Sequence, residues 1–123
     1  MNDKKILVVE DNDLNRKLVR SLLSIRKYEC LEACDAETGI QLAQEVQPDL
    51  VLMDIQLPGM DGFTATKILK ANDKLKSIPI IALTSYAMEE DREKAKKAGC
   101  EGYISKPIDT RTFLDEISVF IQE

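Results

Sequence analysis

The 123-residue sequence contains no histidine, no tryptophan and only three cysteines. Without histidine the protein cannot form a Ser-His-Asp or Cys-His catalytic group, and it cannot itself be a histidine phosphodonor. Cys30, Cys34 and Cys100 do not have the paired spacing of a zinc site, and no histidine is present to complete one. We therefore interpret the three cysteines as small thiols of the core.

Long hydrophobic runs and clusters of basic residues are also missing. No apolar stretch approaches the length of a signal-peptide core or a membrane span, so we expect a cytoplasmic protein with no membrane partner. Lysine and arginine number 17 against 22 aspartate and glutamate residues, a net charge of −5. Direct nucleic-acid binding is therefore not expected. The length and the 44% hydrophobic content predict a single soluble domain, residues 1–123.

Five short segments have the composition of β-strands. Residues 6–9, 50–53 and 80–83 are continuous apolar runs, which is the pattern of strands buried on both faces of a parallel sheet. Residues 30–34 and 102–104 are more mixed, as expected for strands at the edges of a sheet. The three apolar runs are therefore predicted to be the central strands.

Segments with helical spacing of apolar residues alternate with these strands. They are indicated by the following stripes: Leu14, Leu18, Leu22 and Ile25; Ile40, Ala43 and Val46 or Gln47; Phe63, Ile68 and Leu69; Met88, Ala95 and Ala98, ended by Gly99; and Phe113, Leu114, Ile117, Phe120 and Ile121. Five βα units with right-handed crossovers predict an α/β fold. We expect a flavodoxin-like, doubly wound (βα)5 domain whose parallel five-stranded sheet has the order 2-1-3-4-5.

Polar residues follow the predicted strands at their carboxyl ends. They are Glu10 and Asp11 after the first strand, Asp54 at the end of the third, Thr84 and Ser85 after the fourth, and Lys106 and Pro107 after the fifth. Ligands of doubly wound sheets bind beyond these strand ends, so we expect the side chains to converge. Three carboxylates at one rim would repel one another unless a hard cation lay among them. Oxygen ligands without histidine or cysteine favour Mg²⁺ or Mn²⁺.

The predicted metal ligands are Asp11 and Asp54 directly, Glu10 through a water molecule, and the backbone carbonyl of Gln56. A metal-held carboxylate beside a lysine and a hydroxyl is suited to phosphoryl transfer, because cations and donors must meet the charge on three equatorial oxygens. Asp54 is then the nucleophile that becomes phosphorylated. Lys106 would neutralise one phosphoryl oxygen, and the Thr84 hydroxyl with nearby backbone N–H groups, including that of Ser85, would bond another.

Five separate motifs resemble the receiver domain of two-component response regulators, the CheY-like superfamily, along essentially the whole chain. They are Val9-Glu10-Asp11-Asn12, Leu52-Met53-Asp54-Ile55-Gln56-Leu57-Pro58-Gly59, Ala82-Leu83-Thr84-Ser85, Tyr103, and Lys106-Pro107. The sequence of these motifs is most similar to that of single-domain regulators of the DivK kind and of receiver domains of hybrid kinases. A stand-alone regulator is the preferred expectation, and a receiver excised from a hybrid histidine kinase is the alternative.

The resemblance implies a phosphorelay in which a histidine kinase or a histidine phosphotransfer protein donates phosphate to Asp54. The receiver would catalyse this transfer itself and act as a signalling switch rather than as an enzyme. Thr84 and Tyr103 would be switch residues that remodel the face made by the fourth helix, fifth strand and fifth helix, where a downstream protein target would bind. The Lys106–Pro107 peptide bond is expected to be cis.

Three other functions can be considered from the residues alone. One is a phosphorylation-independent adaptor with a receiver fold, against which the retained acid pair, Asp54, Thr84 and Lys106 argue. A small phosphatase of the haloacid-dehalogenase kind would also use Asp54 as a nucleophile with Mg²⁺, but it needs a second aspartate where this chain has Gln56. A flavodoxin-like FMN carrier needs a phosphate-binding loop after the first strand, where Glu10 and Asp11 would repel phosphate. Each motif alone is also compatible with a helix cap or a turn. The phosphorylation hypothesis therefore depends on their joint placement.

Overall fold

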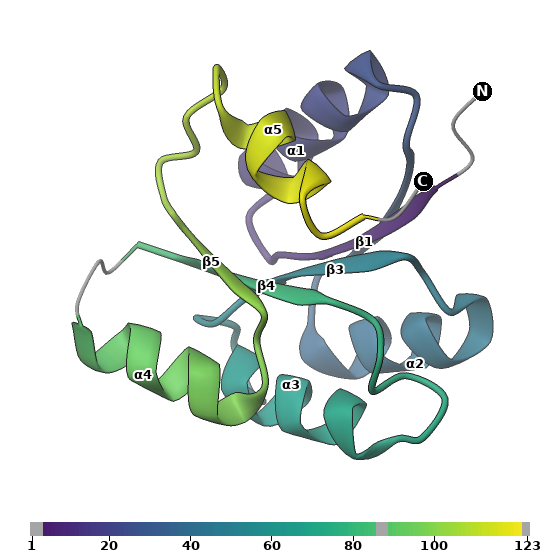
Figure 1. The fold of residues 1–123 in the computed structure, drawn as a ribbon, viewed down its shortest axis with the longest axis vertical. Coiled ribbons are helices and arrows are strands. Elements are labelled where there is room, and N and C mark those ends of the chain that lie inside the picture. The colour runs from purple at the N-terminus through teal and green to yellow at the C-terminus, as the bar shows by residue number, and fades with distance from the viewer. Residues whose placement is uncertain (1–3, 86–88, 122–123) are drawn as a thin grey trace.

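The computed structural model describes residues 4–85 and 89–121, and it forms three layers with a parallel sheet between two layers of helices (Figure 1). The strands are β1 (Lys5–Val9), β2 (Glu29–Ala33), β3 (Leu50–Asp54), β4 (Ile80–Thr84) and β5 (Gly102–Ser105). Their order, β2-β1-β3-β4-β5, confirms the predicted topology. The predicted central strands and edge strands are likewise confirmed.

The helices are α1 (Asp13–Ile25), α2 (Ala36–Val46), α3 (Gly62–Ala71), α4 (Glu89–Ala98) and α5 (Phe113–Ser118). Helices α1 and α5 cover one face of the sheet, and α2, α3 and α4 cover the other (Figure 1). The side chains of Asn12, Asp35 and Asp61 accept hydrogen bonds from backbone N–H groups in the first turns of α1, α2 and α3. Such caps satisfy the free donors at a helix start. No helix in the described part of the chain is long and apolar enough to span a membrane.

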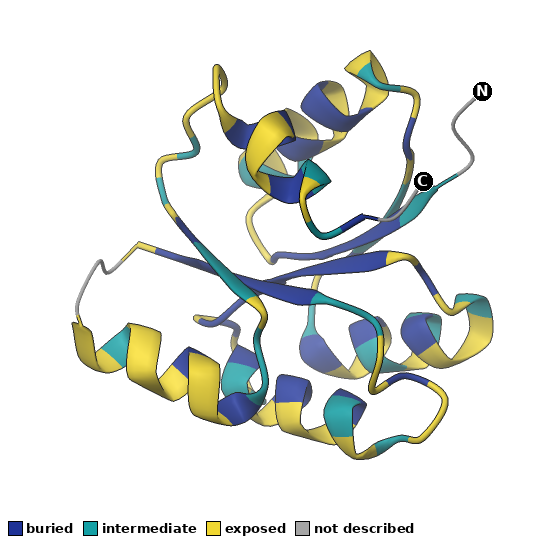
Figure 2. Ribbon diagram, in the orientation of Figure 1, coloured by how far each residue is buried: buried dark blue, intermediate teal, exposed yellow. Residues whose placement is uncertain are grey.

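The central strands are buried on both sides (Figure 2). Alternate side chains of β1 and β3 contribute to two separate cores. Those on the side of α1 and α5 are Ile6, Val8, Leu50 and Leu52, and those on the side of α2 and α3 are Leu7, Val9, Val51 and Met53. Because successive side chains of a strand point to opposite faces, a strand that supplies both cores must be apolar throughout.

The predicted stripe of α1 locates the helix but only part of its buried face, because Leu22 alone of its four residues is buried. The core residues are Val19, Leu22 and Leu23, whereas Leu14 and Ile25 are 77% and 68% exposed. Helix α5 is only 6 residues long against 13 in α1, about 9 Å against about 20 Å. The shorter helix cannot cover both ends of the longer one.

The last two helices also differ from the prediction. Helix α5 ends before Phe120 and Ile121, which the stripe had placed within it, although both side chains still contact the core on that face. Met88, the first residue of the stripe that predicted α4, lies outside the described residues. The predicted end of α4 is confirmed, because Gly99 directly follows the helix with a φ angle of 111°, a conformation that favours glycine.

The prediction that all three cysteines are core thiols is wrong for Cys34, which is exposed. Cys34 follows the edge strand β2, where the chain turns toward α2 and no other element covers it. Cys30 and Cys100 are half-buried. Burial raises the pKa of each of these two thiols to about 11. Both therefore stay protonated at neutral pH, which makes them poor nucleophiles and poor metal ligands.

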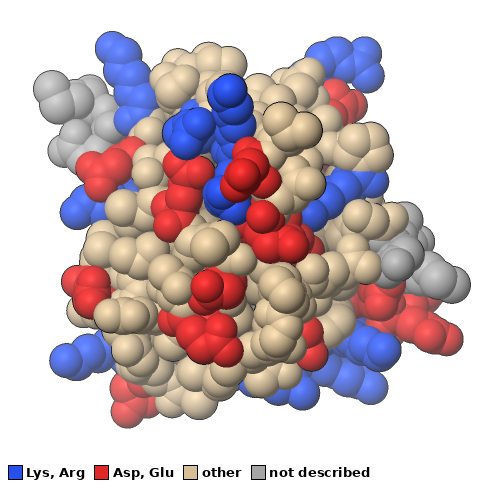
Figure 3. Space-filling model, turned by 180° about the vertical axis from the view of Figure 1, so that it is seen from behind, with Lys and Arg blue, Asp and Glu red and all other residues tan. Residues whose placement is uncertain are grey.

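Surface charge is mixed on the face opposite the view of Figure 1, where acidic side chains gather across the middle with basic ones beside them and along the margins (Figure 3). Ion pairs join adjacent elements, as between Arg20 and Glu32 at 2.8 Å and between Arg26 and Asp115 at 2.5 Å. Exposed pairs of this kind contribute only about 0–1 kcal/mol each. The two hydrophobic cores therefore dominate the stability of the fold.

Gly62 begins α3 directly against the end of β3. A Cβ atom at this position would lie 2.7 Å from the Cα of Ile55 and still closer to the backbone oxygen of Asp54. Backbone atoms cannot turn aside as a flexible side chain can, so we expect Gly62→Ala to lower the free energy of unfolding by about 2–3 kcal/mol. Urea unfolding measures this change.

Gly59→Ala, in the loop that leads into α3, is a matched control. Apart from its two chain neighbours, no other described residue has an atom within 4 Å of a Cβ there, but the φ angle is 75°, so we expect a cost of only about 1 kcal/mol. If Gly62→Ala is no more destabilising than Gly59→Ala, the close approach of α3 to β3 does not matter for stability.

Candidate functional site

The carboxyl ends of the central strands open into a polar cleft of about 500 Å³. Its walls include all three predicted carboxylates, Gln56, Lys106 and the first residues of α1. The cleft lies between β1 and β3, where the order of the strands reverses. Ligands of doubly wound sheets bind at this switch point.

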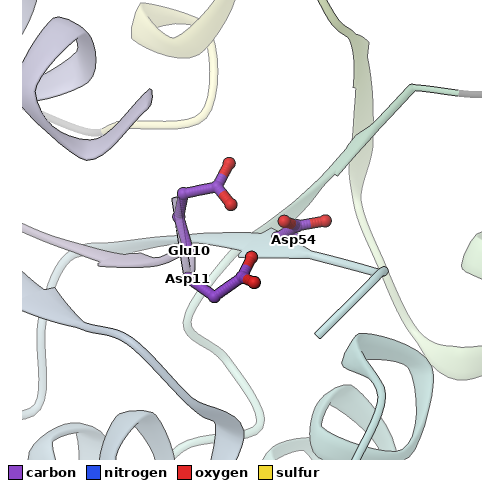
Figure 4. Close-up of side chains that lie close together, drawn as sticks. All are labelled: Glu10, Asp11 and Asp54. Atoms are coloured by element: carbon purple, nitrogen blue, oxygen red, sulfur yellow. The ribbon is translucent and has the colours of Figure 1, made fainter. Parts of the chain in front are cut away.

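Three carboxylates lie together in the cleft. Glu10 and Asp11 follow β1 and Asp54 ends the neighbouring β3, so their side chains face one another at the rim (Figure 4). One carboxylate oxygen from each lies within 4.8 Å of those of the other two. Glu10 and Asp54 are only 1% and 2% exposed, whereas Asp11 is exposed. The group is therefore buried at its base and open to solvent beside Asp11.

Lys106 provides the positive charge that faces these carboxylates. Its Nζ donates to Glu10 Oε1 at 2.5 Å and to Asp54 Oδ2 at 3.0 Å. The backbone N–H of Lys106 bonds to the carbonyl of Thr84 at 2.7 Å, which positions the residue beside β4. When all three carboxylates are ionised, they and the Lys106 ammonium together carry a net charge of −2. The Lys106–Pro107 peptide bond is cis, as the resemblance implied.

The crowding of charge changes the protonation of the site. Burial raises the pKa of Glu10 from 4.5 to about 7; the Asp54 carboxyl adds to this shift and Lys106 opposes it. Burial lowers the pKa of Lys106, but its hydrogen bonds to Glu10 and Asp54 outweigh that effect and raise it above the ordinary value of 10.5. Lys106 is therefore charged at neutral pH, while Glu10 takes up a proton close to neutrality.

The raised pKa of Glu10 predicts how stability depends on pH without metal. Folded Glu10 holds its proton more tightly than the unfolded chain does, so its stabilising contribution is complete below pH 4.5 and is lost as the pH rises through about 7. The difference amounts to at most about 3 kcal/mol. Urea unfolding in EDTA at about pH 5 and about pH 8 would measure it. Glu10→Gln cannot titrate, so an equal loss in that variant would contradict the assignment to Glu10.

The loop after β3 folds back onto the Asp54 carboxylate. The backbone N–H of Gln56 donates to Asp54 Oδ1 at 2.9 Å, so the two Asp54 oxygens have different partners, the loop and Lys106. Gln56 itself is exposed and lines the cleft. Its backbone carbonyl as a metal ligand stays a prediction.

Lys106 lines the cleft, but the other predicted phosphoryl-binding and switch residues, Thr84, Ser85 and Tyr103, do not. Thr84 ends β4 and is buried, and Ser85 follows it and is exposed. Tyr103 in β5 is half-buried and packs against a small core that includes Ala95 of α4. The guanidinium carbon of Arg92 lies 5.1 Å from the centre of the Tyr103 ring. None of the three predicted residues is among those lining the cleft, and their roles stay predictions.

Two residues of α1 that the sequence patterns did not indicate as site residues also hold Glu10. Asn15 Nδ2 donates to Glu10 Oε1 at 3.2 Å, and Arg16 Nη1 donates to the backbone oxygen of Glu10 at 2.7 Å. Their position in the first turn of the helix is the feature from which their contact with Glu10 could have been predicted. Helical side chains lean toward the amino terminus of their helix, so first-turn residues reach back to the preceding strand end.

Comparison with known proteins identifies relatives with a similar sequence. The model of the response regulator receiver domain family matches residues 6–118. The chain is similar to the polar-differentiation response regulator DivK of Brucella anthropi, with 45% identity over 118 residues, or 96% of each chain. DivK of Brucella ovis is 44% identical over the same share of both chains.

Solved structures show the same likeness. The chemotaxis response regulator CheY4 of Vibrio cholerae has a TM-score of 0.92 at 28% identity, covering 98% of this chain and 100% of that one. The receiver domain of the sensor histidine kinase PA1611 from Pseudomonas aeruginosa has a TM-score of 0.89 at 31% identity, covering 97% of this chain and 98% of that one. Its structure has a magnesium ion coordinated in the active site cleft.

Proposed function

This chain belongs to the family of response regulator receiver domains, and we propose that Asp54 is its phosphorylation site, assisted by Mg²⁺ or Mn²⁺. Receiver domains are signalling switches, and this chain is a response regulator of a two-component phosphorelay. The observation that carries the proposal is the buried Asp54 carboxylate, which is bonded to Lys106 and grouped with two further carboxylates.

The donor set in the cleft fits a hard divalent cation. Its three acidic side chains offer oxygen ligands only, which suit Mg²⁺ and Mn²⁺. Asp11 and Asp54 would bind the ion directly, Glu10 through a water molecule, and the backbone carbonyl of Gln56 would add a ligand. The magnesium ion in the cleft of the PA1611 receiver domain supports this assignment.

The phosphoryl group is transferred to an oxygen of Asp54, with formation of a P–O bond and cleavage of the P–N bond to the donor imidazole. Lys106, already 3.0 Å from Asp54 Oδ2, would neutralise one phosphoryl oxygen. The hydroxyl of Thr84 and the backbone N–H of Ser85 would bond a second. A bound divalent cation supplies the charge that meets the third.

The donor in this proposal is a histidine kinase or a histidine phosphotransfer protein. The phosphohistidine must come from another protein, because this chain has no histidine. Response regulators act on downstream targets, and we place the target on the face of α4, β5 and α5, with Thr84 and Tyr103 as switch residues. The contact of Arg92 with the Tyr103 ring already joins α4 to β5 on this face.

Intact-mass spectrometry of the protein with acetyl phosphate tests the phosphorylation chemistry. We expect a gain of one phosphoryl group in the presence of Mg²⁺ or Mn²⁺ and none in EDTA. Acetyl phosphate removes the need for a cognate kinase, so the receiver's own catalysis is measured. The proposal would be contradicted by a protein that gains no phosphoryl group with either metal, from acetyl phosphate or from a phosphorylated histidine phosphotransfer protein.

A further inference from the structure

The Glu10 carboxylate is held by three donors, two from the start of α1 and one from Lys106 after β5. Lys106 Nζ and Asn15 Nδ2 both donate to its Oε1, at 2.5 and 3.2 Å, and the backbone N–H of Asn12 donates to its Oε2 at 3.3 Å. Glu10 is almost fully buried, so these bonds rather than solvent determine how the carboxylate is oriented.

Lys106 cannot bond to Glu10 equally well before and after a phosphoryl group reaches Asp54. The same ammonium also bonds to Asp54, and in the proposed reaction it turns to a phosphoryl oxygen on that residue. When it does so, Asn15 is the only side chain among the described donors to Glu10 that still bonds to its carboxylate.

Asn15 is suited to this task because its amide is neutral. A second cationic group bonded to the Glu10 carboxylate itself would repel a divalent cation at close range, whereas the Arg16 guanidinium bonds to the backbone oxygen of Glu10. An amide N–H bonds to the same carboxylate oxygen and leaves the negative charge available to the cation. The side chain is itself well placed, since the Asn12 side chain accepts a hydrogen bond from the backbone N–H of Asn15 at 2.9 Å and so anchors the first turn of α1.

We infer that Asn15 is a positioning residue that orients the Glu10 carboxylate toward a divalent cation in the cleft. Asn15 acts through Glu10 and not as a ligand. Groups that orient metal-binding side chains in this way typically change metal affinity by about 10- to 100-fold when they are removed. The inference rests on the proposed function, because it presupposes that Glu10, Asp11 and Asp54 hold the cation.

The test measures Mn²⁺ affinity by isothermal titration calorimetry in a double-mutant cycle of Asn15→Ala and Glu10→Ala. Asn15→Ala keeps the backbone bond to Asn12 and is expected to weaken Mn²⁺ binding about 10-fold. In the Glu10→Ala background the same substitution should change affinity by less than about 2-fold, because its effect acts through the missing carboxylate. Ser21→Ala, a neutral exposed change on the same helix, is the control and should bind as the wild type does.

The outcomes of the cycle distinguish the role of Asn15 from the metal site itself. An equal loss from Asn15→Ala with and without the Glu10 carboxylate would overturn the inference, as would no loss in either background. If Glu10→Ala does not fold, by circular dichroism, Glu10→Gln takes its place in the cycle. If the Glu10 variant and Asp54→Asn both bind Mn²⁺ as well as the wild type, the proposed metal site itself is wrong. If they bind weakly while Asn15→Ala binds normally, only the role of Asn15 is wrong.

Discussion

Asp54→Asn should abolish the metal-dependent gain of a phosphoryl group, with a fall in the labelling rate of at least about 1,000-fold. An amide oxygen is far less nucleophilic than a carboxylate, and the substitution keeps the size of a side chain that is almost fully buried. The variant is expected to fold, because removing one of three crowded carboxylates also removes repulsion. Time-resolved intact-mass spectrometry with acetyl phosphate and Mg²⁺ measures the rate.

Asp73→Asn is the matched control for this substitution. Its side chain is 94% exposed and pairs only loosely with Lys76, at 3.6 Å, so the labelling rate should equal that of the wild type. Labelling of Asp54→Asn at the wild-type rate would show that another residue accepts the phosphoryl group, and peptide mapping would then identify it.

Lys106→Met should change metal binding and phosphoryl transfer in opposite directions. The ammonium now bonds to Glu10 and Asp54, so its removal makes the site more negative, and we expect Mn²⁺ to bind about 10-fold more tightly. Phosphoryl transfer loses the cation that meets one transferring oxygen, and its rate should fall by about 100- to 1,000-fold. Calorimetry and labelling kinetics measure the two effects, both at about pH 8, which is above the pKa of about 7 that Glu10 has with Lys106 in place.

Lys17→Met is the control because Lys17 is an exposed lysine of α1 that does not line the cleft. Neither Mn²⁺ affinity nor the labelling rate should change appreciably in this variant. A Lys106→Met protein that binds Mn²⁺ more weakly and is also labelled more slowly would indicate that the lysine supports the structure of the site rather than its charge balance.

The strands and the carboxylates could be predicted from the sequence because a central parallel strand allows only one pattern of residues. It must be apolar on both faces, and its first polar residue marks where it leaves the core. Asp54 was found in this way at the end of β3, and Glu10 after β1. The neighbourhood of these strands then brings their carboxylates within 4.8 Å of one another.

Other features could not be predicted because they depend on which element covers which. Leu14 and Ile25 have the spacing of a buried stripe, yet both are exposed, since the six residues of α5 cover only part of α1. Cys34 is apolar enough for the core but follows an edge strand. The spacing of apolar residues indicates that a segment is an amphipathic helix. Only the packing of neighbouring elements decides which of its side chains are buried.

The sequence by itself determined the order of the βα units and which residues end the central strands, because local apolar patterns encode both. The tertiary structure alone decided how those residues share hydrogen bonds. It places Lys106 between Glu10 and Asp54, although 52 residues separate Lys106 from Asp54, and it turns Asn15 toward Glu10. Hydrogen bonds extend over about 3 Å with a strict angle, so they depend on the final positions of several elements that no single stretch of sequence specifies.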